Sequence, residues 1–132
     1  MRTMEKISKV LKRHKNILFA YIYGSFARGE QRRDSDVDIG VFLKENTKRG
    51  KFYEVELSLE IERDAGMKNV EAVILNGKPL RFLNQVLRYG KLIFSNNERE
   101  RVKFVTFITK SYIDFKPYYK EYDEMRERRL RA

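Results

Sequence analysis

The feature that most constrains the fold is a short polar stretch between two apolar runs. The first run, Ile17 to Tyr23, leads into Gly24-Ser25, and Asp36-Val37-Asp38 opens the second run, which ends at Leu43. Apolar runs of this length, bounded by polar and turn residues, predict two strands joined by a polar loop. Gly24 lacks a Cβ, so a phosphate could approach the backbone closely. The free N–H groups of a short helix opening at Ser25 would also favour an anion.

Two carboxylates stand at the start of the second strand. Side chains alternate between the faces of a strand, so Asp36 and Asp38 point the same way, roughly 6.5 to 7 Å apart. Mg²⁺ prefers hard oxygen ligands and is commonly shared between one or two carboxylates and substrate phosphates. The pair beside the Gly-Ser turn therefore predicts a site for a Mg²⁺-bound triphosphate. The alternative interpretation is a solvated strand entry after an ordinary turn.

The joint pattern resembles a known family. Gly24-Ser25, ten residues and then Asp36-x-Asp38 is similar to the signature of the DNA polymerase β-type nucleotidyltransferase superfamily. The flanking Ala27-Arg28-Gly29-Glu30 and Ser35 resemble the minimal nucleotidyltransferases, the MntA-like antitoxins of HEPN/MNT toxin–antitoxin pairs. The resemblance implies catalytic and metal-binding roles for Asp36 and Asp38. It also implies a nucleotide-binding set, which consists of Gly24, Ser25, Arg28 and Ser35.

A third carboxylate belongs to the same chemistry, because two-metal transfer usually needs a further acid. In the resembled family this acid is typically Asp, in an apolar run that ends in Leu-Asn. The run Val70 to Asn76 matches, with Glu71 at the acidic position. The longer side chain, by ~1.5 Å, is the main departure from the family pattern, and an ångström of misplacement can cost a large factor in rate. Glu71 is therefore either a third catalytic and metal-binding residue or an ordinary glutamate of an edge strand.

The resemblance implies a specific reaction. AMP would pass from ATP to a hydroxyl, a tyrosine of a cognate HEPN ribonuclease toxin, with two Mg²⁺ ions, and the transfer would inactivate the toxin. Two other functions stay open. One is a catalytically inactive antitoxin that neutralises its toxin by binding alone, which Glu71 in place of Asp keeps open. The other is a nucleotidyltransferase that acts on nucleic acid.

Composition narrows these classes further. The chain has no Cys and one His, His14, so any metal must be held by carboxylates. The net charge of +10 fits nucleic acid, but the basic residues are spread over faces and ends rather than gathered into one surface. Nucleic acid is therefore not the favoured partner. No apolar run approaches the ~18 residues of a membrane span, and we expect a cytoplasmic protein without membrane contact.

The remaining pattern predicts an α/β fold: a small mixed sheet of about four strands with helices on one face, and a helical C-terminal extension. Residues 52–67 are ambiguous. Strict alternation of Val55, Leu57, Leu59 and Ile61 favours a strand, whereas the helical spacing of Phe52, Val55 and Leu59, the length of the segment and Gly66 favour a helix, which the resemblance also implies. We predict a helix there, and a break at Pro117 that starts a last helix. The predicted organisation is a nucleotidyltransferase domain over 1–96 and an extension over 97–132 packed on it. Tyrosines of the extension indicate a partner-binding role in an oligomeric complex.

Overall fold

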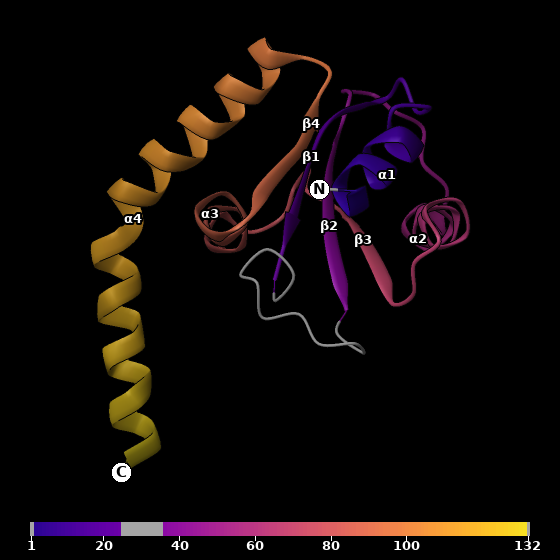
Figure 1. Cartoon of the computed structure of the whole chain (residues 1–132). Helices are drawn as coiled ribbons and strands as arrows, with labels where there is room; N and C mark the ends of the chain where they lie inside the picture. The colour runs from indigo at the N-terminus through magenta and orange to yellow at the C-terminus, as the bar shows by residue number, and fades with distance from the viewer. Residues whose placement is uncertain (1, 25–35, 132) are drawn as a thin grey trace.

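The computed structural model describes residues 2–24 and 36–131 of the chain. Within these residues four strands and four helices follow one another, and Figure 1 shows how they are arranged. In chain order they are α1 (Arg2–Leu11), β1 (Ile17–Tyr23), β2 (Val37–Leu43), α2 (Tyr53–Ala65), β3 (Val70–Ile74), α3 (Leu80–Tyr89), β4 (Lys91–Ser95) and α4 (Glu98–Arg131). Both strands predicted around the polar stretch are confirmed, with β2 beginning at Val37, directly after Asp36.

The strands form one mixed sheet in the order β3-β2-β1-β4. β1 is antiparallel to both β2 and β4, whereas β2 and β3 are parallel. The parallel pair requires a crossover, and α2 supplies it, because a parallel connection needs a dozen or more residues. The predicted four-stranded mixed sheet is confirmed.

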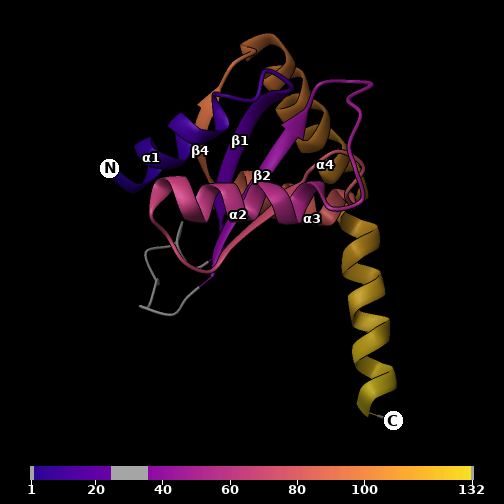
Figure 2. The ribbon, with the colours of Figure 1, turned by 90° about the vertical axis from the view of Figure 1, so that its right-hand side faces the viewer.

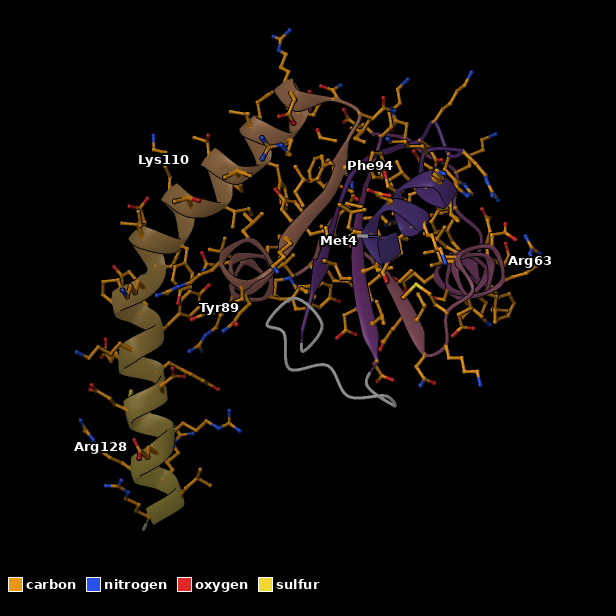
Figure 3. All side chains as sticks on the ribbon, in the orientation of Figure 1. Met4, Arg63, Tyr89, Phe94, Lys110 and Arg128 are labelled. Atoms are coloured by element: carbon orange, nitrogen blue, oxygen red, sulfur yellow. The ribbon has the colours of Figure 1, made fainter. Side chains whose placement is uncertain are left out.

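One face of the sheet packs against α1 and α2 (Figure 2). The residues of β2 that point this way, Val37, Ile39 and Val41, are all buried. They meet buried side chains of both helices, among them Leu11 and Ile61. Phe94 of β4 also belongs to this layer, and Met4 of α1 packs against it (Figure 3). Burial of so many aliphatic side chains makes this layer the main hydrophobic core.

The opposite face is also covered by helices, which the expectation of helices on one face did not include. Phe19 and Tyr21 of β1 form a second buried cluster with Leu83 of α3 and Ile108 of α4. Alternation explains the two layers, since successive residues of β1 point to opposite faces and both sets are apolar. A strand that is apolar on both sides needs cover on both sides.

Residues 53–65 are helical, which resolves the ambiguous pattern in favour of a helix. Of the four alternating apolar residues, only Leu57 and Ile61 are buried, while Val55 and Leu59 are exposed. Leu57 and Ile61 are four residues apart and therefore share one helical face. The helix ends at Gly66, whose left-handed backbone (φ 65°) caps it as predicted.

The predicted break at Pro117 is wrong, because α4 runs unbroken over 34 residues. Asn97 caps its start: the amide N–H of Glu100 donates to Asn97 Oδ1 at 3.0 Å. Pro117 removes only the hydrogen bond to the carbonyl of residue 113, and this part of the helix is open to water, which can satisfy that carbonyl. Among the helices that the structure describes, none is long and apolar enough to cross a membrane.

Side chains of α2 cover the outer edge of β3. The backbone N–H groups of Val70, Ala72 and Ile74 point away from β2 and donate to Glu62 Oε2, Ser58 Oγ and Glu54 Oε2, at 2.9, 2.9 and 2.7 Å. The three acceptors lie four residues apart, one helical turn each, and the three donors lie two residues apart along the strand. One face of α2 therefore satisfies the outward N–H groups of this edge.

Candidate functional site

Three side chains of the site region lie in a row across neighbouring strands. Tyr23 pairs with Asp38 between β1 and β2, and Asp38 pairs with Glu71 between β2 and β3. Residues paired across strands point to the same face, with neighbouring Cβ atoms about 5 Å apart. The row lies at the end of the sheet where β1 ends and where β2 and β3 begin.

The row faces the side of the sheet opposite α1 and α2. Since Val37 and Ile39 point into the main core, Asp38 between them points the other way. Asp36 precedes β2 directly, is exposed, and shares the parity of Asp38. The structure therefore brings the three predicted carboxylates, Asp36, Asp38 and Glu71, to one end of one face.

The carboxylates repel one another electrostatically. Asp38 is half-buried, and burial raises its pKa above the ordinary value of 3.8, with the nearby charges of Glu71 and Asp36 adding to the shift. Burial and like charges both disfavour the ionised form. A cation bound here would relieve this repulsion, so the electrostatics of the row favour a positively charged ligand.

Gly24 fits directly against this row. Its backbone is left-handed, with φ of 74°, and a Cβ built on it would overlap Asp38 Oδ2. Any other residue would therefore be strained and would displace the carboxylate. The predicted pairing of Gly24 with the aspartates is thus a direct steric fit in the fold.

Tyr23 is a site residue that sequence reasoning missed. Its ring packs edge-on against Phe82 of α3, with centroids 5.7 Å apart. Burial raises the pKa of its hydroxyl, and the charges of Asp38 and Glu71 raise it further, so Tyr23 is neutral at physiological pH. One signal in the sequence could have found it: Tyr23 is the last residue of the first apolar run and directly precedes Gly24, so it ends the strand beside the aspartates.

Part of the predicted nucleotide-binding set cannot be placed. Ser25, Arg28 and Ser35, and the short helix expected to open at Ser25, lie outside the described residues, so their roles remain predictions. Within residues 2–24 and 36–131, no three His, Cys, Asp or Glu side chains lie close enough together to hold a metal ion by themselves. Mg²⁺ needs only one or two protein carboxylates when phosphates and waters complete its shell, so Asp36 and Asp38 fit it chemically.

A hollow of the described chain lies elsewhere. It has a volume of about 500 Å³ and lies between α3 and α4, where Arg81, Tyr112 and Pro117 are among its lining residues. None of the three carboxylates lines it. The hollow is therefore separate from the carboxylate row.

Comparison with known proteins places this geometry in context. The family model described as Polymerase beta, Nucleotidyltransferase matches residues 5–99. The protein adenylyltransferase MntA of Thermococcus cleftensis is 42% identical over 67 residues, which cover 46% of this chain and 68% of the relative.

Two solved structures share the fold. One is a toxin–antitoxin crystal structure with AMP-PNP, with a TM-score of 0.67, 21% identity, and coverage of 89% of this chain and 96% of the other. The second is a tri-AMPylated HEPN toxin of Shewanella oneidensis in complex with MNT antitoxin; here the TM-score is 0.61, the identity 18% and the coverage 92% and 98%. At these identities the likeness establishes the fold alone.

The family match spans all four strands, and it includes Gly24 and the three carboxylates that the fold places at one end of the sheet. The sequence match and the shared fold thus agree with the resemblance carried by the Gly-Ser and Asp-x-Asp pattern. We conclude that this chain belongs to the DNA polymerase β-type nucleotidyltransferase family.

Proposed function

We propose that the chain is a Mg²⁺-dependent protein adenylyltransferase. It transfers AMP from ATP to a tyrosine hydroxyl of a HEPN-family toxin and thereby acts as its antitoxin. The observation that carries the proposal is the row of Asp38 and Glu71 beside Asp36, with Gly24 fitted against Asp38, in a chain of the nucleotidyltransferase family. The names of the relative and of the structural neighbours support the choice of a protein acceptor.

Each residue has a separate part in this reaction. Gly24 lets the triphosphate approach the backbone, and Asp36 and Asp38 would hold Mg²⁺. Bound Mg²⁺ supplies charge neutralisation on the phosphates and a lower pKa for the acceptor hydroxyl. The acceptor oxygen forms a bond to the α-phosphorus while the bond from that phosphorus to the bridging oxygen breaks, and pyrophosphate leaves.

Glu71 would complete the reaction by taking the acceptor proton. Its place beside Asp38 in the strand register puts a carboxylate next to the metal-binding pair. The proposal includes a second Mg²⁺, which Asp36, Asp38 and Glu71 would hold together with phosphates and waters. Positioning and electrostatic stabilisation are the main contributions that a protein makes to such transfers.

A second candidate function is an inactive antitoxin that acts by binding alone. Two observations favour it: Glu stands where the family typically has Asp, and no three described carboxylates converge tightly enough to hold a metal by themselves. In this case the fold would serve as a binding scaffold, and loss of the carboxylates would leave neutralisation of the toxin intact.

The decisive experiment mixes the chain with a purified HEPN protein encoded beside it, α-labelled ATP and Mg²⁺, with EDTA in a parallel reaction. Asp36→Asn and Glu71→Gln test the row, and Glu56→Gln, an exposed residue of α2, is the matched control. We expect AMP on a partner tyrosine by mass spectrometry, lost in both row variants and with EDTA but kept in the control.

Other outcomes separate the alternatives. A stable complex without label would support the inactive antitoxin. Label that appears only on added RNA would indicate a nucleic-acid acceptor and contradict the proposal. Loss in Asp36→Asn but full activity in Glu71→Gln would remove Glu71 from the reaction.

A further inference from the structure

One face of α4 carries a regular row of residues that extends beyond the domain. Seven positions follow one another at alternating steps of four and three: Phe104, Ile108, Ser111, Phe115, Tyr118, Tyr122 and Met125. This is the heptad spacing at which one helix presents a continuous stripe to a neighbour. All seven positions therefore lie along one side of α4.

The first part of this stripe is already used by the fold. Phe104 packs against Phe19 and Phe42, with ring centroids 5.3 and 5.0 Å apart. Ile108, one turn later, is buried in the same cluster. Where α4 crosses the sheet, this side of the helix thus forms part of a hydrophobic core.

The second part is exposed. Its four residues, which we call the docking seam, are Phe115, Tyr118, Tyr122 and Met125, with exposed fractions of 51, 66, 62 and 48%. No other helix or strand of the described chain lies beside the last turns of α4, which carry Arg128 (Figure 3). A stripe that is core in one half of a helix and solvent-exposed in the other indicates an interaction surface.

The contacts of α3 leave the seam free. Arg81 of α3 donates from Nη1 to Asp123 Oδ1 at 3.1 Å, and its guanidinium lies 5.0 Å from the ring centroid of Tyr119. Tyr119 also stacks on Tyr112, with centroids 5.6 Å apart. These contacts are made by the side of α4 that lies next to the seam. They fix the orientation of the helix and leave the seam uncovered.

We propose that the docking seam binds a helix of the protein that accepts AMP. This inference rests on the proposed function. The four side chains would pack into the grooves of a partner helix that carries apolar residues at the same heptad spacing.

The position of the C-terminal half of α4 supports the acceptor protein as the partner of the docking seam. The C-terminal half of α4 extends past the end of the sheet where β1 ends and β2 begins, and Figures 1 and 2 agree on this. That is the end that carries Asp38 and Glu71. A protein held on the seam would therefore lie at the catalytic end of the molecule.

The family match gives a second argument. It ends at residue 99, at the start of α4, so the seam lies outside the region that the nucleotidyltransferase model matches. The similarity to the toxin–antitoxin structure with AMP-PNP covers 89% of the chain, which residues before α4, 97 of 132, cannot supply alone. Part of α4 thus belongs to the fold shared with a protein that was crystallised with a toxin.

Charge selects the kind of partner helix. The C-terminal end of α4 is basic, with Arg126, Arg128 and Arg129. The acidic residue among them, Glu127, is paired with Arg131 at 2.8 Å. The partner helix should therefore carry acidic residues beside its apolar stripe. Parallel pairing with a second copy of this chain is disfavoured, because it would place Arg129 next to Arg129.

The test uses a matched pair of double variants in the full-length chain. Tyr118→Glu with Tyr122→Glu places charge on the seam, and Val102→Glu with Ile113→Glu does so at exposed positions on another side of α4. The probe is the purified HEPN protein encoded beside this chain. Calorimetry without ATP measures binding, and labelled ATP measures transfer at low and saturating HEPN protein.

We expect the seam variant to bind about tenfold or more weakly and the control to bind like wild type. Transfer by the seam variant should fall at low HEPN protein and recover at saturation, because its carboxylates are intact.

Unchanged binding in the seam variant would overturn the inference, and so would no binding by wild type. Light scattering that shows a wild-type dimer lost only in the seam variant would assign the seam to a second copy and also overturn it. Wild type that binds through the seam but transfers no AMP would instead refute the proposed activity.

Discussion

The two sides of β2 differ in what they contribute to the protein. Toward α1 and α2 the strand presents Val37, Ile39 and Val41, all buried in an apolar layer. Toward the other side it presents Asp38, half-buried beside Glu71, and then Gly40. The same seven residues thus supply both core and candidate chemistry.

The difference shows how a small domain accommodates crowded charge. Asp38 lies in an environment that disfavours its ionised form, which costs stability, while the apolar side chains on either side of it anchor the strand. Strand alternation separates the two tasks by one residue. Substitutions on the two sides should therefore change different measured quantities.

The largest effect is expected on the charged side. Asp38→Asn should lower AMP transfer by about three orders of magnitude, comparable to removing a key electrostatic group from other active sites. The purified variant should remain folded and should keep its HEPN-binding affinity, since the seam on α4 is unchanged. Labelled-ATP transfer and calorimetry measure the two quantities. Transfer within tenfold of wild type would contradict the role of Asp38.

The stability of Asp38→Asn relative to wild type should depend on pH. Because the pKa of Asp38 is raised in the folded protein, the folded state binds its proton more tightly than the unfolded state does. The resulting stabilisation is complete below pH 3.8 and is lost as pH rises through the raised pKa. The melting temperature of Asp38→Asn minus that of wild type should therefore increase with pH above 3.8. A difference that stays constant or decreases would contradict the sign of the shift.

On the apolar side, Ile39→Ala should lower the free energy of unfolding by about 3 kcal/mol, because Ile39 is fully buried and its loss leaves a cavity. Urea unfolding measures this value. Leu59→Ala on the exposed side of α2 is the control and should change it by less than about 0.5 kcal/mol. Below its melting temperature, Ile39→Ala should still transfer AMP. Loss of transfer in the folded variant would show that the two sides of β2 are not separable.

Gly24→Ala tests where the loop meets the charged side. The left-handed backbone should cost about 1–2 kcal/mol of stability, and the new methyl group would push against Asp38. We expect both weaker transfer and a lower melting temperature. Gly77→Ala, also left-handed (φ 79°) but with open space around it, is the control for strain alone. Equal loss of transfer in both variants would refute the steric link to Asp38.

The smallest effect is expected for Tyr23→Phe. The ring and its contact with Phe82 are kept, so the free energy of unfolding should change by less than about 1 kcal/mol. Transfer should fall less than tenfold if the hydroxyl only borders the site. A fall as large as that of Asp38→Asn would instead make Tyr23 a catalytic residue.

Sequence alone predicted the sheet well, because polar and turn residues mark both ends of the apolar runs of β1 and β2. The pattern was less decisive for α2, since the alternating and the helical sets share Val55 and Leu59, and both residues are exposed. The burial of Leu57 and Ile61, one helical turn apart, shows which face the helix turns inward. Pro117 misled the prediction because the cost of a lost helical hydrogen bond depends on access to water, which local sequence does not report.

The candidate site was predicted in part for the same reason. Asp38 and Glu71 were found through the family pattern, but their pairing in the β2–β3 register depends on the tertiary fold. Tyr23 was missed because it belongs to an apolar run and becomes a neighbour of Asp38 only when β1 and β2 pair. Ser25, Arg28 and Ser35 stay predictions.

The ladder of Glu54, Ser58 and Glu62 along β3 has a consequence for how this protein meets other chains. An exposed edge strand is a template on which a foreign strand can add and on which aggregation can start. Here the outward N–H groups of Val70, Ala72 and Ile74 are occupied by α2. This edge is therefore closed to strand addition, and an apolar strand such as β3 can remain at the margin of the sheet without recruiting neighbours.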